Sequence, residues 1–133
     1  MAHMTATPAQ RLATERNIWL ATVRPDGRPH VAPVWFVFVR NRVWVGNGAG
    51  SVRMRNLTSN PAVTLCLEEG DTPIVAEGTA TIHPTERPPD VVAAFQGKFG
   101  WDVTRSEDPD IGTLVLLEIE VRKWLFGVEL PTS

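Results

Sequence analysis

The sequence predicts a mainly β fold with short helices, in which six strands form an antiparallel barrel. Runs rich in β-branched and aromatic residues recur along the chain, as is typical of strands. Between them lie mostly hairpin-length segments rich in glycine, proline, asparagine and aspartate, which are the usual turn residues. The length of 133 residues suits one domain with one core.

The first half of the chain is expected to contain one helix, three strands and a glycine-rich loop. The first two strands form a hairpin, because Arg24-Pro25-Asp26-Gly27-Arg28 places proline and Asp-Gly where turns favour them. In chain order we expect a helix over 11–16 capped by Thr7 or Thr14, strands over 18–23, 30–39 and 43–45, and a glycine loop over 46–50.

The second half is expected to contain two helices and three strands. Ser51 is a typical N-cap for the first helix, and Asn60-Pro61 ends it, because a residue before proline avoids helical geometry. Val92, Phe95 and Phe99 share one face of the second helix. In chain order we expect a helix from 52, strands over 62–68 and 74–83, a helix after 84–89 that ends at Gly100, an acidic loop over 101–110, and a strand over 112–123.

Composition and charge exclude several classes of function. The formal net charge is −2, whereas general nucleic-acid binders are usually strongly basic. No apolar stretch approaches the roughly 20 residues that span a bilayer, and no signal peptide is visible. We therefore expect a cytoplasmic protein with no nucleic-acid or membrane partner. The lone Cys66 lies in an apolar run and is expected to be a buried small hydrophobe.

The first four residues, Met-Ala-His-Met, resemble a cloning remnant with Met4 as the natural start. We therefore expect residues 1–10 to be a remnant and a disordered N-terminus. Residues 11–133 are expected to form the single domain.

The segment 30–39 lacks the alternation of apolar and polar residues that a strand with one solvated face shows. Because nearly every residue from Val31 to Val39 is apolar, both faces of this strand should be covered. One face lines the core, and the other should meet a partner subunit or a flat ligand; a helix packed over it is the alternative. Pro33 cannot donate a sheet hydrogen bond, so it marks an edge or a bulge with backbone groups free to contact a ligand ring.

The glycine loop and the helix after it favour binding of a phosphate. Glycines let the backbone approach a phosphate closely, and a helix N-terminus adds free N–H groups and partial positive charge. Ser51 adds a hydroxyl and Arg53 adds a cation, while Arg55 points about 200° away from Arg53 on a regular helix. A capped surface helix with solvated arginines is the alternative. The pattern is neither a P-loop nor a dinucleotide-binding fingerprint.

Several stretches of the sequence resemble one known family. Residues 20–36, LATVRPDGRPHVAPVWF, resemble the opening of the pyridoxamine 5′-phosphate oxidase-like split-barrel family, whose members bind flavins or deazaflavins. Residues 51–57 and 60–63, SVRMRNL and NPAV, resemble its phosphate-binding helix, and residues 75–80 resemble its fifth strand. The resemblance covers residues 11–127 and is greatest to the short actinobacterial branch thought to use the deazaflavin coenzyme F420.

The resemblance implies a split barrel of the FMN-binding type, working as a homodimer with two cofactor sites at the subunit interface. It implies a cofactor phosphate near Ser51 and Arg53, where the family often has lysine instead of Arg53. It also implies that the cofactor ring lies against the second and third strands. Trp124 stands where family members often present an aromatic to the partner's cofactor; a terminal core tryptophan is the alternative. The candidate cofactor-binding residues are Pro33, Val34, Trp35, Phe36, Asn47, Gly48, Ser51, Val52, Arg53, Arg55, Asn56 and Trp124.

The leading functional hypothesis is an F420-dependent reductase that transfers a hydride to an unsaturated or conjugated small molecule. The alternatives are an FMN-binding oxidoreductase of the same fold and a non-enzymatic carrier of the cofactor or of another conjugated ligand. The sequence shows no metal-ligand cluster, serine elbow or catalytic triad. We assign no catalytic side chain, because such a cofactor carries the chemistry itself, and His30 as a proton donor stays open. The family's additional basic residues for a substrate phosphate are lacking, so pyridoxamine 5′-phosphate oxidase activity itself is not expected.

Overall fold

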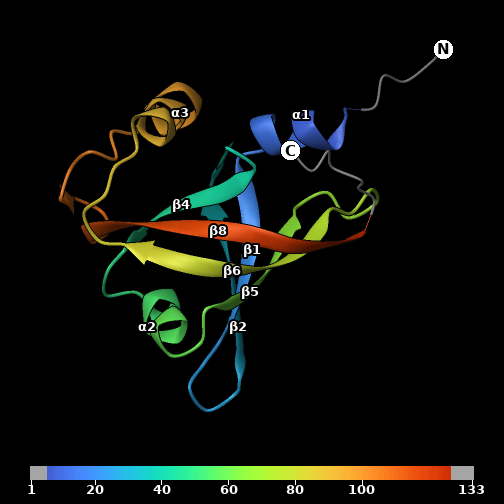
Figure 1. Ribbon diagram of the computed structural model, residues 1–133, viewed down its shortest axis with the longest axis horizontal. Helices are drawn as coiled ribbons and strands as arrows, with labels where there is room; N and C mark the ends of the chain where they lie inside the picture. The colour runs from blue at the N-terminus through green and yellow to red at the C-terminus, as the bar shows by residue number, and fades with distance from the viewer. Residues whose placement is uncertain (1–5, 127–133) are drawn as a thin grey trace.

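The computed structural model describes residues 6–126, which form the mainly β fold that the sequence predicts. The strands form a curled antiparallel sheet (Figure 1). Its strand order is β2-β1-β5-β6-β8-β4-β3, and the short β7 pairs with β8. The described residues contain eight strands rather than six, because the segment 30–39 forms two strands and the expected loop 101–110 contains β7. The strands are β1 (Asn17–Val23), β2 (Pro29–Trp35), β3 (Val37–Val39), β4 (Arg42–Gly48), β5 (Ala62–Leu67), β6 (Val75–His83), β7 (Glu107–Asp108) and β8 (Gly112–Phe126).

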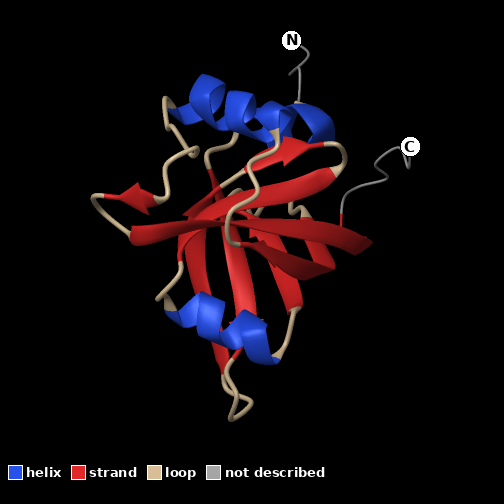
Figure 2. Ribbon diagram, turned by 60° about the vertical axis from the view of Figure 1, so that its left-hand side comes forward, coloured by secondary structure: helices blue, strands red, loops and turns tan. Residues whose placement is uncertain are grey.

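Helices lie at both ends of the curled sheet. α1 and α3 lie at one end and α2 lies at the other (Figure 2). α1 begins three residues before the expected Arg11, because proline suits the first turn and Thr7 forms a capping box with Gln10. Pro8 to Gln10 are therefore helical, where the sequence predicted a disordered N-terminus. The helices are α1 (Pro8–Thr14), α2 (Val52–Ser59) and α3 (Pro89–Phe99).

The predicted helix ends of α2 and α3 are confirmed. The Ser51 hydroxyl oxygen accepts a hydrogen bond from the backbone N–H of Met54 at 3.3 Å, which caps α2. α3 ends at Gly100, which has φ of +64°, a conformation that favours glycine. The buried face of α3 is centred on Val91 and Phe95, so it is rotated relative to the face that the sequence predicted.

The single strand expected over 30–39 is divided at Phe36. β2 pairs with β1, whereas β3 pairs with β4, and these two pairs form opposite ends of the strand order. Phe36, which is fully buried, joins the two ends of the sheet and so curls the sheet into a barrel. The continuous apolar pattern contains no turn residue at this position, so the sequence does not reveal the break.

The glycine segment was expected to be a loop, and this prediction is wrong for residues 46–48. These residues belong to β4 and pair with β8, with Gly46 opposite Leu116 and Gly48 opposite Leu114. A Cβ on Gly46 would overlap the Trp101 ring, and a Cβ on Gly48 would overlap the backbone carbonyl oxygen of Ile111. The glycines therefore allow close approach of the segment 101–111, as glycine inside a strand often does.

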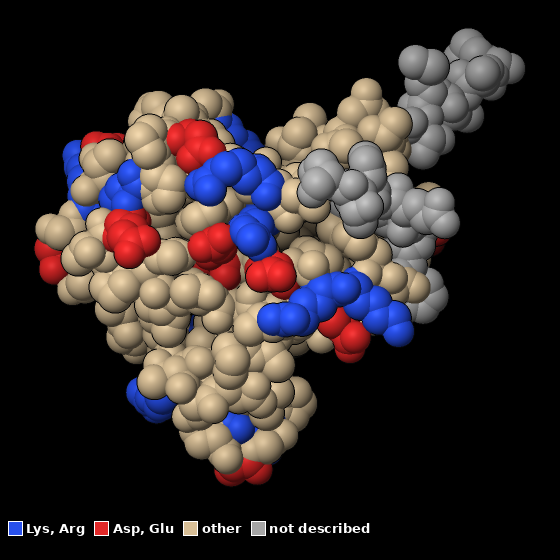
Figure 3. Space-filling model, viewed as in Figure 1, with Lys and Arg blue, Asp and Glu red and all other residues tan. Residues whose placement is uncertain are grey.

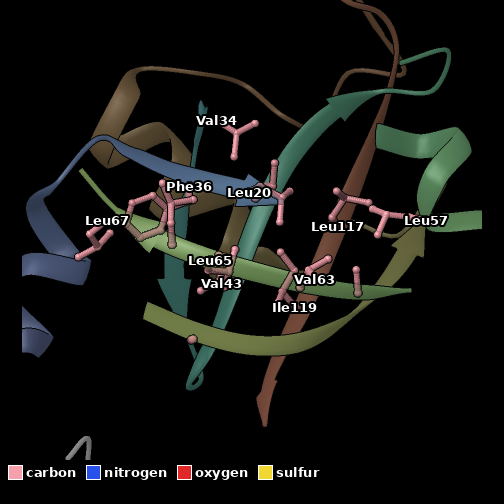
Figure 4. Packing of buried hydrophobic residues seen from close by; sticks show 14 of the residues in the cluster. Leu20, Val34, Phe36, Val43, Leu57, Val63, Leu65, Leu67, Leu117 and Ile119 are labelled. Atoms are coloured by element: carbon pink, nitrogen blue, oxygen red, sulfur yellow. The ribbon is translucent and has the colours of Figure 1, made fainter. Parts of the chain in front are cut away.

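Two hydrophobic clusters hold the fold together. The larger one fills the barrel interior, where Leu20, Phe36, Leu65 and Ile119 converge (Figure 4). The second lies between α3 and the other face of β4 and β8, and it includes Trp44, Val91, Phe95, Leu114 and Leu116. Because these strands are covered on both faces, their positions are fixed, and β4 forms a rigid wall for the site described below.

Three further features concern the cysteine, the surface charges and the helices. Cys66 lies opposite Trp19 on the neighbouring strand and is half-buried rather than fully buried. Acidic and basic side chains are interspersed on the face seen in Figure 3. Within residues 6–126, no helix is long and apolar enough to cross a membrane.

Candidate functional site

A cavity of about 330 Å³ opens between β2, β4, the start of α2 and the segment 101–111. Apolar and aromatic side chains form most of its lining, with a few polar groups, which is typical of cofactor sites. The lining residues are Pro33, Val34, Trp35, Gly46, Asn47, Arg53, Trp101, Asp108, Asp110 and Ile111.

A chain of hydrogen bonds forms the basic end of this cavity. The Nη2 of Arg53 donates to the Asn47 side-chain oxygen at 2.7 Å. The amide of Asn47 donates in turn to the Ser51 hydroxyl at 2.9 Å. Asn47 itself is almost fully buried in β4, so it holds Arg53 from a fixed strand rather than from a mobile loop.

Arg53 carries a partly buried positive charge. No carboxylate of residues 6–126 lies within ion-pair distance of its guanidinium. Its Nε is buried without a hydrogen-bond partner, and burial lowers the pKa of the guanidinium. Because a desolvated cation is costly without a counter-charge, this end of the cavity suits an anionic group of a ligand.

His30 lies close to this basic end but does not line the cavity. Its Nδ1 is buried without a hydrogen-bond partner. Burial, followed by the charges of Arg24 and Arg53, lowers the pKa of the His30 imidazole below 6.5. This shift disfavours the protonated imidazole, and the place of His30 outside the cavity argues against contact with a bound ring.

Aromatic rings form the opposite wall. Trp35 stacks on Phe99 with ring centroids 4.5 Å apart and an interplanar angle of 8°. Trp101 meets Trp35 edge-on, with centroids 6.0 Å apart. The indole N–H of Trp101 donates to the Asp108 carboxylate at 3.0 Å, which fixes the ring over Gly46. These rings form an ordered apolar wall against which a flat conjugated ligand can pack.

The structure brings part of the predicted site together. Five of the candidate residues line the cavity, and Ser51 supports it through its hydrogen bond with Asn47. The outward face of β2 is apolar, as predicted, with Val31 and Trp35 58% and 41% exposed. The five lining residues are Pro33, Val34, Trp35, Asn47 and Arg53.

Other candidate residues lie elsewhere. Phe36 is fully buried in the barrel interior and so does not face the cavity. Asn56 is also buried, and its amide donates to the Thr22 hydroxyl at 3.0 Å, so it fastens α2 to β1. Gly48 packs under Ile111. None of these three residues lines the cavity of the single chain, and their role in cofactor binding stays a prediction.

Val52 and Arg55 line a separate cavity beside α2. Trp124 packs against the barrel core, where its strand position faces Ala76. It is eight residues along β8 from Leu116, the partner of Gly46, or about 26 Å at ordinary strand rise. Trp124 therefore does not reach the cavity of its own chain.

Residues of the segment 101–111 were missed as part of the site. Trp101, Asp108 and Asp110 belonged to the acidic loop expected over 101–110 with no assigned role, and Ile111 directly follows that loop. The available signal was the pair of glycines at 46 and 48, because glycine within a strand marks close approach of another group. The identity of that group depends on distant parts of the chain, which local patterns do not reveal.

Comparisons with known proteins agree with this architecture. The chain resembles the structure of an F420 reductase, with a TM-score of 0.70 and 20% identity, covering 92% of this chain and 98% of that chain. It also resembles HutZ, the heme storage protein of Vibrio cholerae, with a TM-score of 0.70 and 21% identity, covering 89% of this chain and 91% of that chain. A pyridoxamine 5′-phosphate oxidase-related, FMN-binding protein of Nostoc punctiforme has a TM-score of 0.60 and 20% identity, covering 80% of this chain and 71% of that chain.

These identities show a shared fold. A comparison with curated proteins finds no match. The family model described as pyridoxamine 5′-phosphate oxidase matches residues 4–126, which is nearly the whole chain. The curled antiparallel sheet, the short helices at its ends and this match together show that the chain belongs to the pyridoxamine 5′-phosphate oxidase-like family of split barrels.

Proposed function

We propose that the protein binds the deazaflavin coenzyme F420 in this cavity and uses it to reduce an unsaturated or conjugated small molecule. The observation that carries the proposal is Arg53, a partly buried cation without a carboxylate partner among residues 6–126, held by Asn47 at the end of an aromatic-walled cavity. A phosphate supplies the missing counter-charge, and a flat ring fits the apolar wall.

The residues present fit such a cofactor. The buried, unpartnered Nε of Arg53 is a free donor for a phosphate oxygen. Trp35 and Trp101 offer ring surfaces, and Pro33 leaves a backbone position on β2 that makes no sheet N–H bond. When bound, a reduced deazaflavin supplies a hydride that adds to the conjugated acceptor, while a proton from water completes the reduction and the cofactor is left oxidised.

Support for F420 over FMN comes from the family. The two cofactors share a tricyclic ring and a ribityl phosphate, so Arg53 and Ser51 serve either one. One structurally similar protein is an F420 reductase, and another is an FMN-binding protein. The resemblance of the sequence to the short F420-using branch favours the deazaflavin.

The choice of cofactor is tested by parallel titrations. Trp35 and Trp101 line the cavity, so quenching of tryptophan fluorescence reports on binding of FMN and of F420. We expect micromolar or tighter binding of F420. Binding of FMN but not of F420 would overturn the choice of cofactor without contradicting the assignment of the binding site. Binding of neither cofactor would overturn the proposal.

Reductase activity is tested separately. Reduced F420 is mixed with the protein and a panel of enones and quinones, and cofactor oxidation is followed by absorbance. We expect oxidation that requires both protein and acceptor. Tight cofactor binding without turnover across the panel would favour the carrier function instead.

We also propose a homodimer formed through the outer face of β1 and β2. Trp19 lies opposite Pro33 in the strand register, so it shares a face with Val31 and Trp35. All three large side chains are exposed in the single chain. Because Trp35 also lines the cavity, a partner on this face would cover the cofactor ring from one side.

A further inference from the structure

Between α3 and β8 the chain forms a lobe, residues 103–114, which includes β7 and lies in the orange part of the ribbon in Figure 1. The lobe supplies Asp108, Asp110 and Ile111 to the lining of the cavity. Only its two end residues, Val103 and Leu114, are buried, and every residue between them is exposed or half-buried. Burial therefore anchors the ends of the lobe, and polar contacts must position the rest.

Arg87, which lies just before α3, reaches both ends of this lobe. Its Nε donates to the carbonyl oxygen of Val103 at 2.6 Å, and its Nη2 donates to the carbonyl oxygen of Leu114 at 2.8 Å. The third nitrogen, Nη1, donates to the carbonyl oxygen of the neighbouring Glu86 at 3.1 Å. One guanidinium thus ties the start of the lobe to its end.

The positive charge of Arg87 serves these backbone contacts rather than an ion pair. Among residues 6–126, no carboxylate lies within ion-pair distance of its guanidinium. Burial lowers the pKa of this guanidinium, as is usual for a cation that has lost part of its hydration. Since arginines usually keep the charged head in water, a partly desolvated guanidinium spread over three carbonyl oxygens indicates a role in holding the backbone.

The lobe in turn fixes the aromatic wall of the cavity. One oxygen of the Asp108 carboxylate accepts the indole N–H of Trp101 at 3.0 Å. The other oxygen accepts the backbone N–H of Asp110 at 2.9 Å, within the lobe itself. A shift of the lobe would therefore move the Asp108 carboxylate and release the Trp101 ring from its position in the wall.

We propose that Arg87 is a positioning residue of the cavity, which holds both ends of the lobe and so fixes the wall against which the cofactor ring packs. The inference rests on the proposed function, because it assigns the ring of the cofactor to this wall. Arg87 does not line the cavity, and Arg53 at the basic end is held separately by Asn47. Arginine suits the task because its planar fork presents several N–H donors in fixed directions, whereas lysine is a point charge.

The test separates binding of the ring from binding of the phosphate. Affinities are measured by tryptophan fluorescence for F420 and for the same deazaflavin cut back to its ribityl chain, which lacks the phosphate. Arg87→Met keeps the length of the side chain and removes its donors, so both ligands should bind about 5- to 50-fold more weakly than to wild type. The ratio of the two affinities should stay at its wild-type value, whereas Arg53→Ala should remove most of that ratio.

A second readout, amide hydrogen exchange, needs no ligand. Within the lobe, the backbone N–H of Leu114 donates to the carbonyl oxygen of Ser106 at 2.9 Å. In the Arg87→Met protein the amides of the lobe should exchange about 10-fold faster, while those of β1 and β5 should exchange as in wild type. A general loss of stability would instead speed up exchange across the whole sheet.

Two further variants complete the test. Arg105→Met is the matched control, because it removes an exposed arginine of the same lobe that does not line the cavity. It should bind both ligands as wild type does. Arg87→Lys keeps the charge without the fork, so it should also weaken binding of both ligands, and it carries the test if the Arg87→Met protein does not fold.

The outcomes separate this inference from the proposed function. If Arg87→Met binds both ligands as tightly as wild type, with or without faster exchange in the lobe, Arg87 does not position the wall and the cofactor assignment stands. If Arg87→Met weakens binding of F420 alone, the residue acts through the phosphate and the inference is wrong. Wild-type affinities of Arg87→Lys would likewise contradict the role of the fork. If wild type binds neither ligand, the proposed function falls and this inference falls with it.

Discussion

Arg53 and Arg55 lie two residues apart on α2 and face different cavities. Helix geometry alone predicts this divergence, and the structure confirms it. Asn56 shows where a motif stops being informative, because its buried amide bonds to Thr22 instead of lining the cavity. A motif fixes the residue type and the helix position, whereas the contact partner depends on which strand packs against that helix face.

Lys98 on α3 is a partly buried cation that the sequence did not single out. Its Nζ donates to the carbonyl oxygen of Phe36 at 2.9 Å and lies 3.9 Å from the centre of the Phe36 ring. Burial, with a smaller effect of the Arg16 charge, lowers the pKa of Lys98 to about 8. The residue therefore binds its proton less tightly in the folded chain than in the unfolded chain.

This shift predicts how stability depends on pH. Between pH 8 and 10.5 the unfolded chain holds more protons at this position than the folded chain, so the free energy of unfolding rises with pH. From pH 7 to pH 10 the free energy of unfolding of the wild-type protein should rise by about 1–2 kcal/mol more than that of the Lys98→Met variant, after allowance for solvent screening. Urea unfolding at both pH values measures it. Lys123→Met, which removes an exposed lysine, should behave as wild type; a Lys98→Met protein with the same rise as wild type would contradict the account.

At the scale of elements, the sequence predicted the order of helices and strands and most of their bounds. Local signals sufficed where turn residues or caps mark an end, as Ser51 and Gly100 do. Local signals did not predict the structure correctly where it depends on residues distant in the sequence. The glycines at 46 and 48 resemble a loop locally, but they are glycines because Trp101 and Ile111 pack against β4.

The role of these glycines in β4 is testable by adding one methyl group. Gly48→Ala places a Cβ against the backbone carbonyl of Ile111, which is held by its own chain and does not move cheaply. We expect a loss of about 1–3 kcal/mol in the free energy of unfolding by urea denaturation. Gly50→Ala is the control, because a Cβ there meets open space. Equal stabilities of the two variants would show that the close approach does not constrain β4.

At the scale of the whole molecule, the fold class was predictable because the strands are separated by short turns. Closure of the barrel was not predictable, because β2 and β3 lie at opposite ends of the strand order, where β2 pairs with β1 and β3 pairs with β4. The continuous apolar character of residues 31–39 predicted a strand covered on both faces. In the single chain Val34 is buried, whereas Val31 and Trp35 on the outer face are exposed, so the covering of that face stays a prediction. Part of that outer face lines the cavity, and the rest remains the proposed dimer surface.

The dimer is best tested at Val31, which is the most exposed of the large apolar residues on this face and does not line the cavity. Val31→Glu places a charge in the proposed interface without disturbing the core, so it should give a folded monomer in analytical ultracentrifugation. A charge at Phe36 would disrupt the barrel interior instead, because that side chain is fully buried. Leu125→Glu, an exposed apolar position on β8, should remain dimeric. A Val31→Glu protein that stays dimeric would show that the dimer interface lies on another surface.

The central claim is that Arg53 binds the phosphate of a flat cofactor. The most direct measurement is the affinity of wild type and Arg53→Ala for the cofactor and for its dephosphorylated form. Loss of hydrogen bonds to a charged group, at about 1.5–3 kcal/mol, predicts a 10- to 150-fold weaker affinity for the phosphorylated cofactor. The dephosphorylated form should bind both proteins equally. An Arg53→Ala protein that folds normally and binds the phosphorylated cofactor as tightly as wild type would contradict the account.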